Sequence, residues 1–141
     1  MPQLTRWFIK TAFAYFILAL LAGVLLGAQA IWAFNPPAAD ILPTYFHLLA
    51  EGWLTLLIVG VAFWLFPKYS LAQPHRSERL GWTSYALLNV GLLMRLVSEP
   101  VNATVGHPAS AWAILLSIAA IVQWLGGMAF VVNTWARVKE K

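Results

Sequence analysis

Four ionisable side chains interrupt the apolar stretches of this 141-residue chain: His47, Glu51, Arg95 and Glu99. His47 and Glu51 are four residues apart, as are Arg95 and Glu99, so in helices each pair shares one face. A neutral imidazole can ligate a metal ion or a haem iron, and an arginine can bind a propionate or another anion with its charged fork of donors. The spacing is therefore typical of a binding site formed by two helix faces.

The same residues have a structural interpretation and a metal-site interpretation. Ionisable groups inside a bilayer cost roughly 2.5–3.5 kcal/mol each on insertion scales, so they need partners. In the structural interpretation Arg95 lies between Glu99 and Glu51, with His47 nearby, and the network only fastens two helices together. In the metal interpretation His47 ligates copper or zinc, Glu51 shares its face, and His107 approaches from a loop. The residues themselves leave these alternatives open.

The elements that must position these residues are membrane helices. The chain is 61% hydrophobic and only 10% charged, too little polar surface for a globule in water. Four apolar runs long enough to span a bilayer, which takes ~20 residues, are expected at about 7–34, 42–66, 80–98 and 108–136. The sequence thus predicts an all-α, integral membrane four-helix bundle, with residues 1–141 as one transmembrane domain. The first run is too long for a secretory signal, whose apolar region has roughly 7–15 residues.

Basic residues predict the orientation of these helices. Of nine Lys and Arg residues, eight fall at the N-terminal end, in the loop near residues 68–79, or at the C-terminal end. Positive residues of short loops stay in the cytoplasm, so both chain ends are expected inside. Because they are spread over three segments rather than gathered in one patch, no nucleic-acid partner is expected. The absence of cysteine excludes thiolate metal sites and iron–sulfur clusters.

This topology places the four ionisable residues at similar depth. At 1.5 Å per residue, His47 lies ~7 Å and Glu51 ~13 Å below the outer end of the second helix. By the same measure Arg95 lies ~7 Å below the outer end of the third helix, and Glu99 lies at its rim. The four side chains are therefore expected together in the outer half of the bundle.

Two segments resemble a known family. The run from Phe46 to Ala62, FHLLAEGWLTLLIVGVA, and its continuation FWLFP resemble the second helix of subunit I of the haem-copper oxidase superfamily, especially its nitric oxide reductase and cbb3-type branches. The segment from Arg79 through Asn89 and Arg95 to Pro100 resembles small stand-alone membrane proteins grouped with that subunit. In that family a histidine near the outer end of the second helix is an axial ligand of the low-spin haem. His47 is the residue at the matching position.

The resemblance implies a b-type haem protein of the inner membrane of a prokaryote. It implies cofactor binding by His47 with Arg95, Glu51, Glu99 and His107 around it, for electron transfer or for binding nitric oxide or oxygen. The second axial ligand would be His107, a methionine such as Met94 or Met128, or a second protomer of a homodimer, or the position would stay open to a gas.

The chain also departs from that family. A complete subunit I has many more helices and metal-binding histidines than the four helices and the single in-span histidine, His47, predicted here. Respiratory catalysis by this chain alone is therefore not expected, and no catalytic motif is visible. The alternative is an accessory or assembly subunit that packs beside a respiratory oxidase or a nitric oxide reductase in the lipid bilayer.

Overall fold

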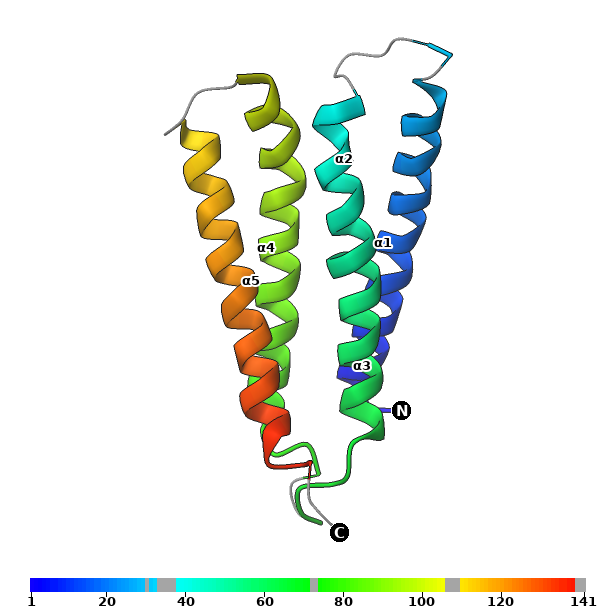
Figure 1. The fold of residues 1–141 in the computed structure, drawn as a ribbon. Helices are drawn as coiled ribbons and strands as arrows, with labels where there is room; N and C mark the ends of the chain where they lie inside the picture. The colour runs from blue at the N-terminus through cyan, green and yellow to red at the C-terminus, as the bar shows by residue number, and fades with distance from the viewer. Residues whose placement is uncertain (30, 33–37, 72–73, 106–109, 139–141) are drawn as a thin grey trace.

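A computed structural model describes residues 1–29, 31–32, 38–71, 74–105 and 110–138 of the chain. Its helices are α1 (Gln3–Ala28), α2 (Ala38–His47), the π-helix η1 (Leu48–Thr55), α3 (Leu56–Leu65), α4 (Glu78–Val105) and α5 (Ala111–Trp135). Because α2, η1 and α3 follow one another without a break, they form one rod, and the described chain has four long helices (Figure 1).

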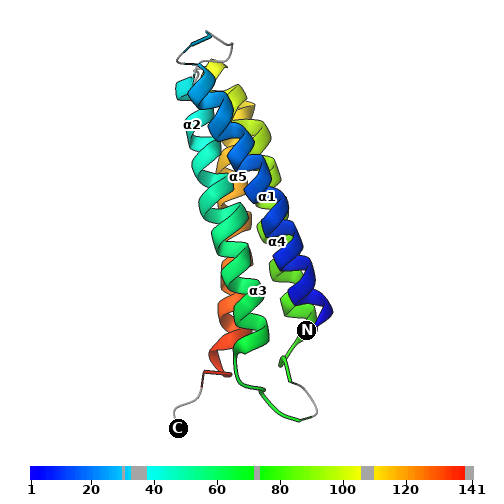
Figure 2. The ribbon, with the colours of Figure 1, turned by 90° about the vertical axis from the view of Figure 1, so that its right-hand side faces the viewer.

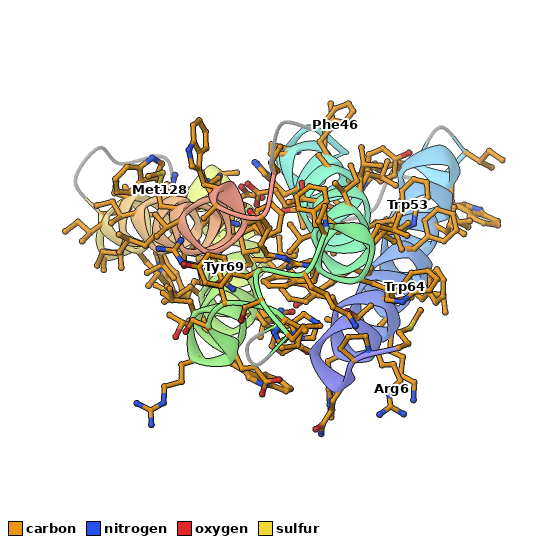
Figure 3. The ribbon with its side chains drawn as sticks, turned by 90° about the horizontal axis from the view of Figure 1, so that it is seen from below. Arg6, Phe46, Trp53, Trp64, Tyr69 and Met128 are labelled. Atoms are coloured by element: carbon orange, nitrogen blue, oxygen red, sulfur yellow. The ribbon has the colours of Figure 1, made fainter. Side chains whose placement is uncertain are left out.

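All four helices are long and apolar enough to cross a membrane, which confirms the predicted all-helical bundle and is the architecture of a multi-pass membrane protein. They run antiparallel in sequence order, and the start of α1 lies at the same end of the bundle as the end of α5 (Figures 1 and 2). Large apolar side chains cover the perimeter, where Phe46 and Trp64 point away from the bundle (Figure 3). A bilayer is the solvent that suits this surface.

The helix ends differ from those predicted. α1 ends at Ala28, where the Ile31 amide donates to the Ala28 carbonyl at 2.9 Å and closes a turn, rather than near residue 34. α4 was expected to end before Pro100 but continues to Val105. Proline removes one backbone hydrogen bond, and a membrane helix tolerates this loss when neighbouring groups satisfy the freed carbonyls. α5 begins at Ala111, capped by the Ser110 hydroxyl, which accepts from the Ala113 amide at 3.1 Å.

Two helix pairs form the bundle. α4 and α5 pack along their length, and α1 packs on η1 and α3, while α2 joins the pairs by contacting α4. Close approach within the first pair depends on Gly91 and Gly126, since a methyl group at Gly126 would lie 2.9 Å from the Leu88 amide nitrogen. The buried apolar core lies between α1, the α2–η1–α3 rod and α4. Its members are Phe8, Ala12, Tyr15, Ala19, Leu48, Leu56, Val59, Phe63 and Leu92.

Candidate functional site

A π-helical segment positions Glu51. η1 begins directly after His47 and spans eight residues, and the Thr55 hydroxyl donates to the Ala50 carbonyl, five residues back, at 2.8 Å. Gly52 lies against Tyr15, where a methyl group would approach the Tyr15 Cβ to 2.8 Å. π-Helical turns are rare and occur often at functional sites, because they rotate the side chains that follow relative to an α-helix. The helical spacing of His47 and Glu51 gave no sign of this segment.

The Glu99 carboxylate is the centre of the polar cluster. Its side chain is only 7% exposed. Oε2 accepts from the Thr44 hydroxyl at 3.1 Å, and Oε1 accepts from Arg95 Nη1 at 3.1 Å. Nδ1 of His47 lies 2.9 Å from the same Oε1. Glu99 therefore connects Thr44 and His47 of α2 to α4. Thr44 lies one helical turn before His47, and the sequence did not identify it as a member of this polar cluster.

Gln123 connects this cluster to α5. Arg95 Nε donates to Gln123 Oε1 at 3.1 Å, and the Gln123 amide nitrogen donates to Glu51 Oε2. The predicted contact of Arg95 with Glu51 is thus replaced by a contact through Gln123. Membrane glutamines commonly form hydrogen bonds between helices, but the position of Gln123 between two charged groups could not be predicted from the sequence.

His47 keeps one ring nitrogen available. Its side chain is 29% exposed, and within the described part of the chain nothing pairs with Nε2. Metal-ligating imidazoles commonly present their second nitrogen to a carboxylate, which fixes the ring and raises its basicity. Nδ1 lies 2.9 Å from Glu99 Oε1, a close approach without the angle of a hydrogen bond, and this position leaves Nε2 for a metal centre.

The other candidate ligands are not brought to His47 by the described structure. His107 lies outside the described residues. Met128 is at the outer surface of α5 (Figure 3). Among the described residues, no group of three or more His, Cys, Asp or Glu side chains is placed to hold a metal ion. The predicted copper or zinc site of His47, Glu51 and His107 therefore stays a prediction.

A groove lies beside the cluster, between η1, α4 and α5. It has a volume of about 350 Å³, and we call it the η1–α5 groove. α5 packs on α4 and makes little contact with the described α2–η1–α3 rod, so the groove opens on the side of the bundle. Its lining residues are Glu51, Thr55, Leu88, Arg95, Ala120, Gln123, Trp124 and Gly127. The predicted residues Glu51 and Arg95 therefore both face a space that a ligand can enter.

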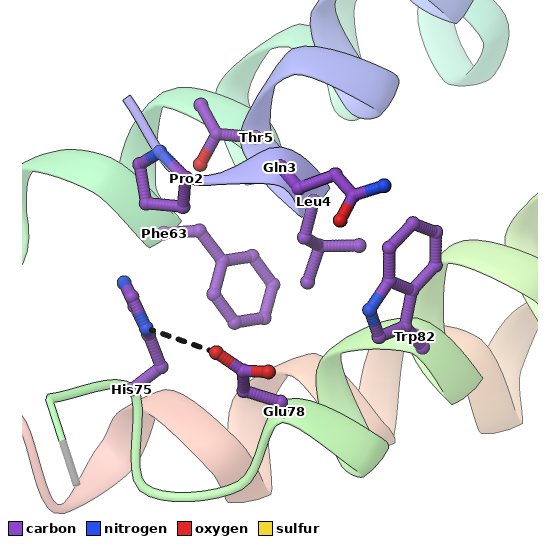
Figure 4. Close-up of a pocket in the computed structure, with 8 residues that line it drawn as sticks. All are labelled: Pro2, Gln3, Leu4, Thr5, Phe63, His75, Glu78 and Trp82. Atoms are coloured by element: carbon purple, nitrogen blue, oxygen red, sulfur yellow. Dashed lines mark ion pairs between the residues drawn. The ribbon is translucent and has the colours of Figure 1, made fainter.

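A smaller cavity of about 120 Å³ lies at the opposite end, between the first turn of α1, the end of α3 and the start of α4 (Figure 4). His75 lines it, with Nδ1 3.9 Å from Glu78 Oε1. Burial, and next the charge of Arg137, lowers the pKa of His75 below its ordinary 6.5, so the ring is neutral at pH 7. The cavity partly encloses His75, although this residue belongs to the polar loop that connects α3 to α4.

Arg137 is the buried cation of this end of the bundle. Its side chain is only 1% exposed and donates to the carbonyls of Phe63, Phe66 and Pro67 at 3.0, 2.8 and 3.0 Å. These carbonyls end α3, where the helix dipole favours a positive charge. The sequence indicated only that Arg137 lies on the cytoplasmic side. Its role in fastening the end of α5 to the end of α3 needed the structure.

Comparison with protein families, curated proteins and solved structures gave no match for this chain. The site is therefore interpreted from its own residues. Four of the five residues predicted for it, His47, Glu51, Arg95 and Glu99, form one connected polar cluster with Thr44 and Gln123.

Proposed function

We propose that this chain is a membrane protein that binds b-type haem, with His47 as an axial ligand through Nε2. The observation that carries this proposal is the position of His47 Nδ1, 2.9 Å from the buried Glu99 carboxylate, with Nε2 left without a partner in the described chain. When bound, haem supplies reversible one-electron chemistry and an iron that can take nitric oxide or oxygen.

The residues around His47 have separate tasks in this proposal. Glu99 lies against the imidazole and fixes its orientation, and Thr44 and Arg95 hold Glu99 in place. Arg95 uses Nε and Nη1 within the cluster. Among the described residues no acceptor pairs with its Nη2, so this nitrogen can donate to a propionate. A second protein ligand beside His47 would suit the group to electron transfer, and the lack of one would let it bind a gas.

A second candidate is an accessory subunit of a respiratory oxidase or nitric oxide reductase in a prokaryotic inner membrane. The η1–α5 groove favours it, because Glu51 and Arg95 line a space that opens sideways at membrane depth. Polar groups exposed to lipid are costly, so a partner helix that covers them stabilises the assembly. In this case the cluster is structural and His47 ligates nothing.

An absorption spectrum of the purified protein, expressed with ample haem, separates the two candidates. We expect a Soret band in the wild-type protein and no Soret band in His47→Ala. His75→Ala is the matched control, because it removes a histidine outside the cluster, and it should keep the band. A wild-type protein without a Soret band contradicts haem binding, and co-purification of that haem-free chain with oxidase subunits supports the accessory role. A Soret band unchanged in His47→Ala excludes His47 as the ligand.

A further inference from the structure

The η1–α5 groove combines a polar end with apolar walls in the middle of the membrane. Gln123 is twelve residues from each end of α5, so it lies about 18 Å from either end at 1.5 Å per residue. Glu51 lies near the middle of the span Ile41–Leu65. The hydrocarbon core is about 30 Å thick, so phospholipid head groups stay about 15 Å from its centre. A ligand that meets these side chains must therefore carry its polar atoms into the hydrocarbon core.

The polar end of the groove has an unused acceptor. Glu51 Oε2 accepts from Gln123, whereas Oε1 has no donor among the residues that the structure describes. Because Glu51 lines the groove, Oε1 is available to a hydroxyl group of a ligand. An acyl chain has no hydroxyl and would leave this oxygen without a hydrogen-bond donor, which is unfavourable.

The apolar walls suit a flat ring. Trp124 is 63% exposed and lines the groove together with Leu88, Ala120 and Gly127. An indole ring stacks favourably on another ring, and this adds to the gain from the apolar area that it buries. The groove volume of about 350 Å³ is at the lower end of the roughly 300–1,000 Å³ typical of small-molecule sites.

We propose that the η1–α5 groove binds the head group of a membrane quinol or quinone. This class unites a flat ring, oxygen atoms that form hydrogen bonds, and residence in the hydrocarbon core. A quinol hydroxyl donates to Glu51 Oε1, the ring lies against Trp124, and the isoprenoid tail leaves through the open side of the groove. The proposal concerns binding alone and does not rest on haem at His47.

Photolabelling of the full-length protein in nanodiscs tests this proposal, with an azidoquinone that carries a decyl tail as the probe. The haem-free protein is used, so the result is independent of the proposed function. We expect the label on residues 51–55 and 120–127, and we expect excess decylubiquinone to suppress it. A label spread evenly over lipid-facing residues, or one that decylubiquinone leaves unchanged, overturns the proposal.

Two glycines provide matched variants. A Cβ atom added at Gly127, in the groove, or at Gly27, on α1, meets no atom within 4 Å, so both positions have open space for the start of a side chain. Gly127→Leu fills the groove, and we expect the competed label to fall about tenfold, because overpacking a site costs about 1–3 kcal/mol. Gly27→Leu keeps the wild-type label. Equal labelling of the two variants overturns the proposal.

A third variant keeps the test decisive if Gly127→Leu does not fold. Trp124→Ala removes the stacking surface at an exposed position, and circular dichroism and size exclusion verify its fold. We expect the competed label to fall about fivefold, as the loss of about 1 kcal/mol of stacking implies. An unchanged label in folded Trp124→Ala contradicts the proposed seat of the ring.

Discussion

Replacing Glu99 by leucine is expected to destabilise the bundle strongly. The change removes the acceptor of Arg95 and of Thr44. Among the described residues, Gln123 is then the remaining hydrogen-bond partner of the Arg95 side chain, which is 18% exposed. Breaking a buried pair costs about 3–5 kcal/mol, and the partial exposure of Arg95 places this case at about 3 kcal/mol. The contact between α2 and α4 loosens as a result.

Unfolding by sodium dodecyl sulfate in mixed micelles, followed by circular dichroism, measures this effect. Glu78→Leu is the matched control, because the Glu78 side chain is 82% exposed and its removal is expected to cost less than about 1 kcal/mol. The double variant Arg95→Leu with Glu99→Leu removes both charges, so we expect it to be about 1–3 kcal/mol more stable than the sum of the single changes implies. Strict additivity, or equal effects of Glu99→Leu and Glu78→Leu, refutes the coupling of Arg95 to Glu99.

Three further outcomes follow from the fold. Arg137→Ala frees three carbonyls at the end of α3 and should lower the free energy of unfolding by about 2–4 kcal/mol, whereas exposed Arg79→Ala should leave it unchanged in the same micelle titration. Gly52→Ala forces a methyl group into an occupied space and should cost about 1–3 kcal/mol, while Gly27→Ala should cost nothing, measured by thermal unfolding. Folding lowers the pKa of His75, so as the pH falls the unfolded chain takes up the proton at a higher pH than the folded chain does. Stability should therefore fall as the pH drops below about 6.5. His75→Asn should flatten this dependence, measured as the melting temperature against pH.

The sequence was sufficient for the membrane helices and for most of the candidate site. Apolar length and the distribution of basic residues depend on one chain segment at a time, so they identify four spans without knowledge of packing. The pair Arg95 and Glu99 is local in the same sense, since both residues lie one turn apart on α4, and the structure confirms it.

The parts that sequence reasoning missed depend on contacts between distant segments. Gln123 is 28 residues from Arg95 and 72 from Glu51, and only the packing of α5 on α4 decides that it lies between them. The π-helix is a small change in backbone hydrogen bonding at the place where Gly52 packs closely on another helix. No local sequence pattern predicts it. The burial of Arg137 is likewise set by the docking of α5 beside the end of α3.

The proposed ligand Nε2 of His47 is tested most directly by His47→Gly with added imidazole. If His47 binds the iron, the haem-loaded variant has no wild-type Soret band, and free imidazole restores that band by filling the space that the side chain left. His75→Gly should keep the wild-type spectrum without imidazole. A full Soret band in His47→Gly before imidazole is added, or a wild-type protein that takes up no haem, would contradict the account.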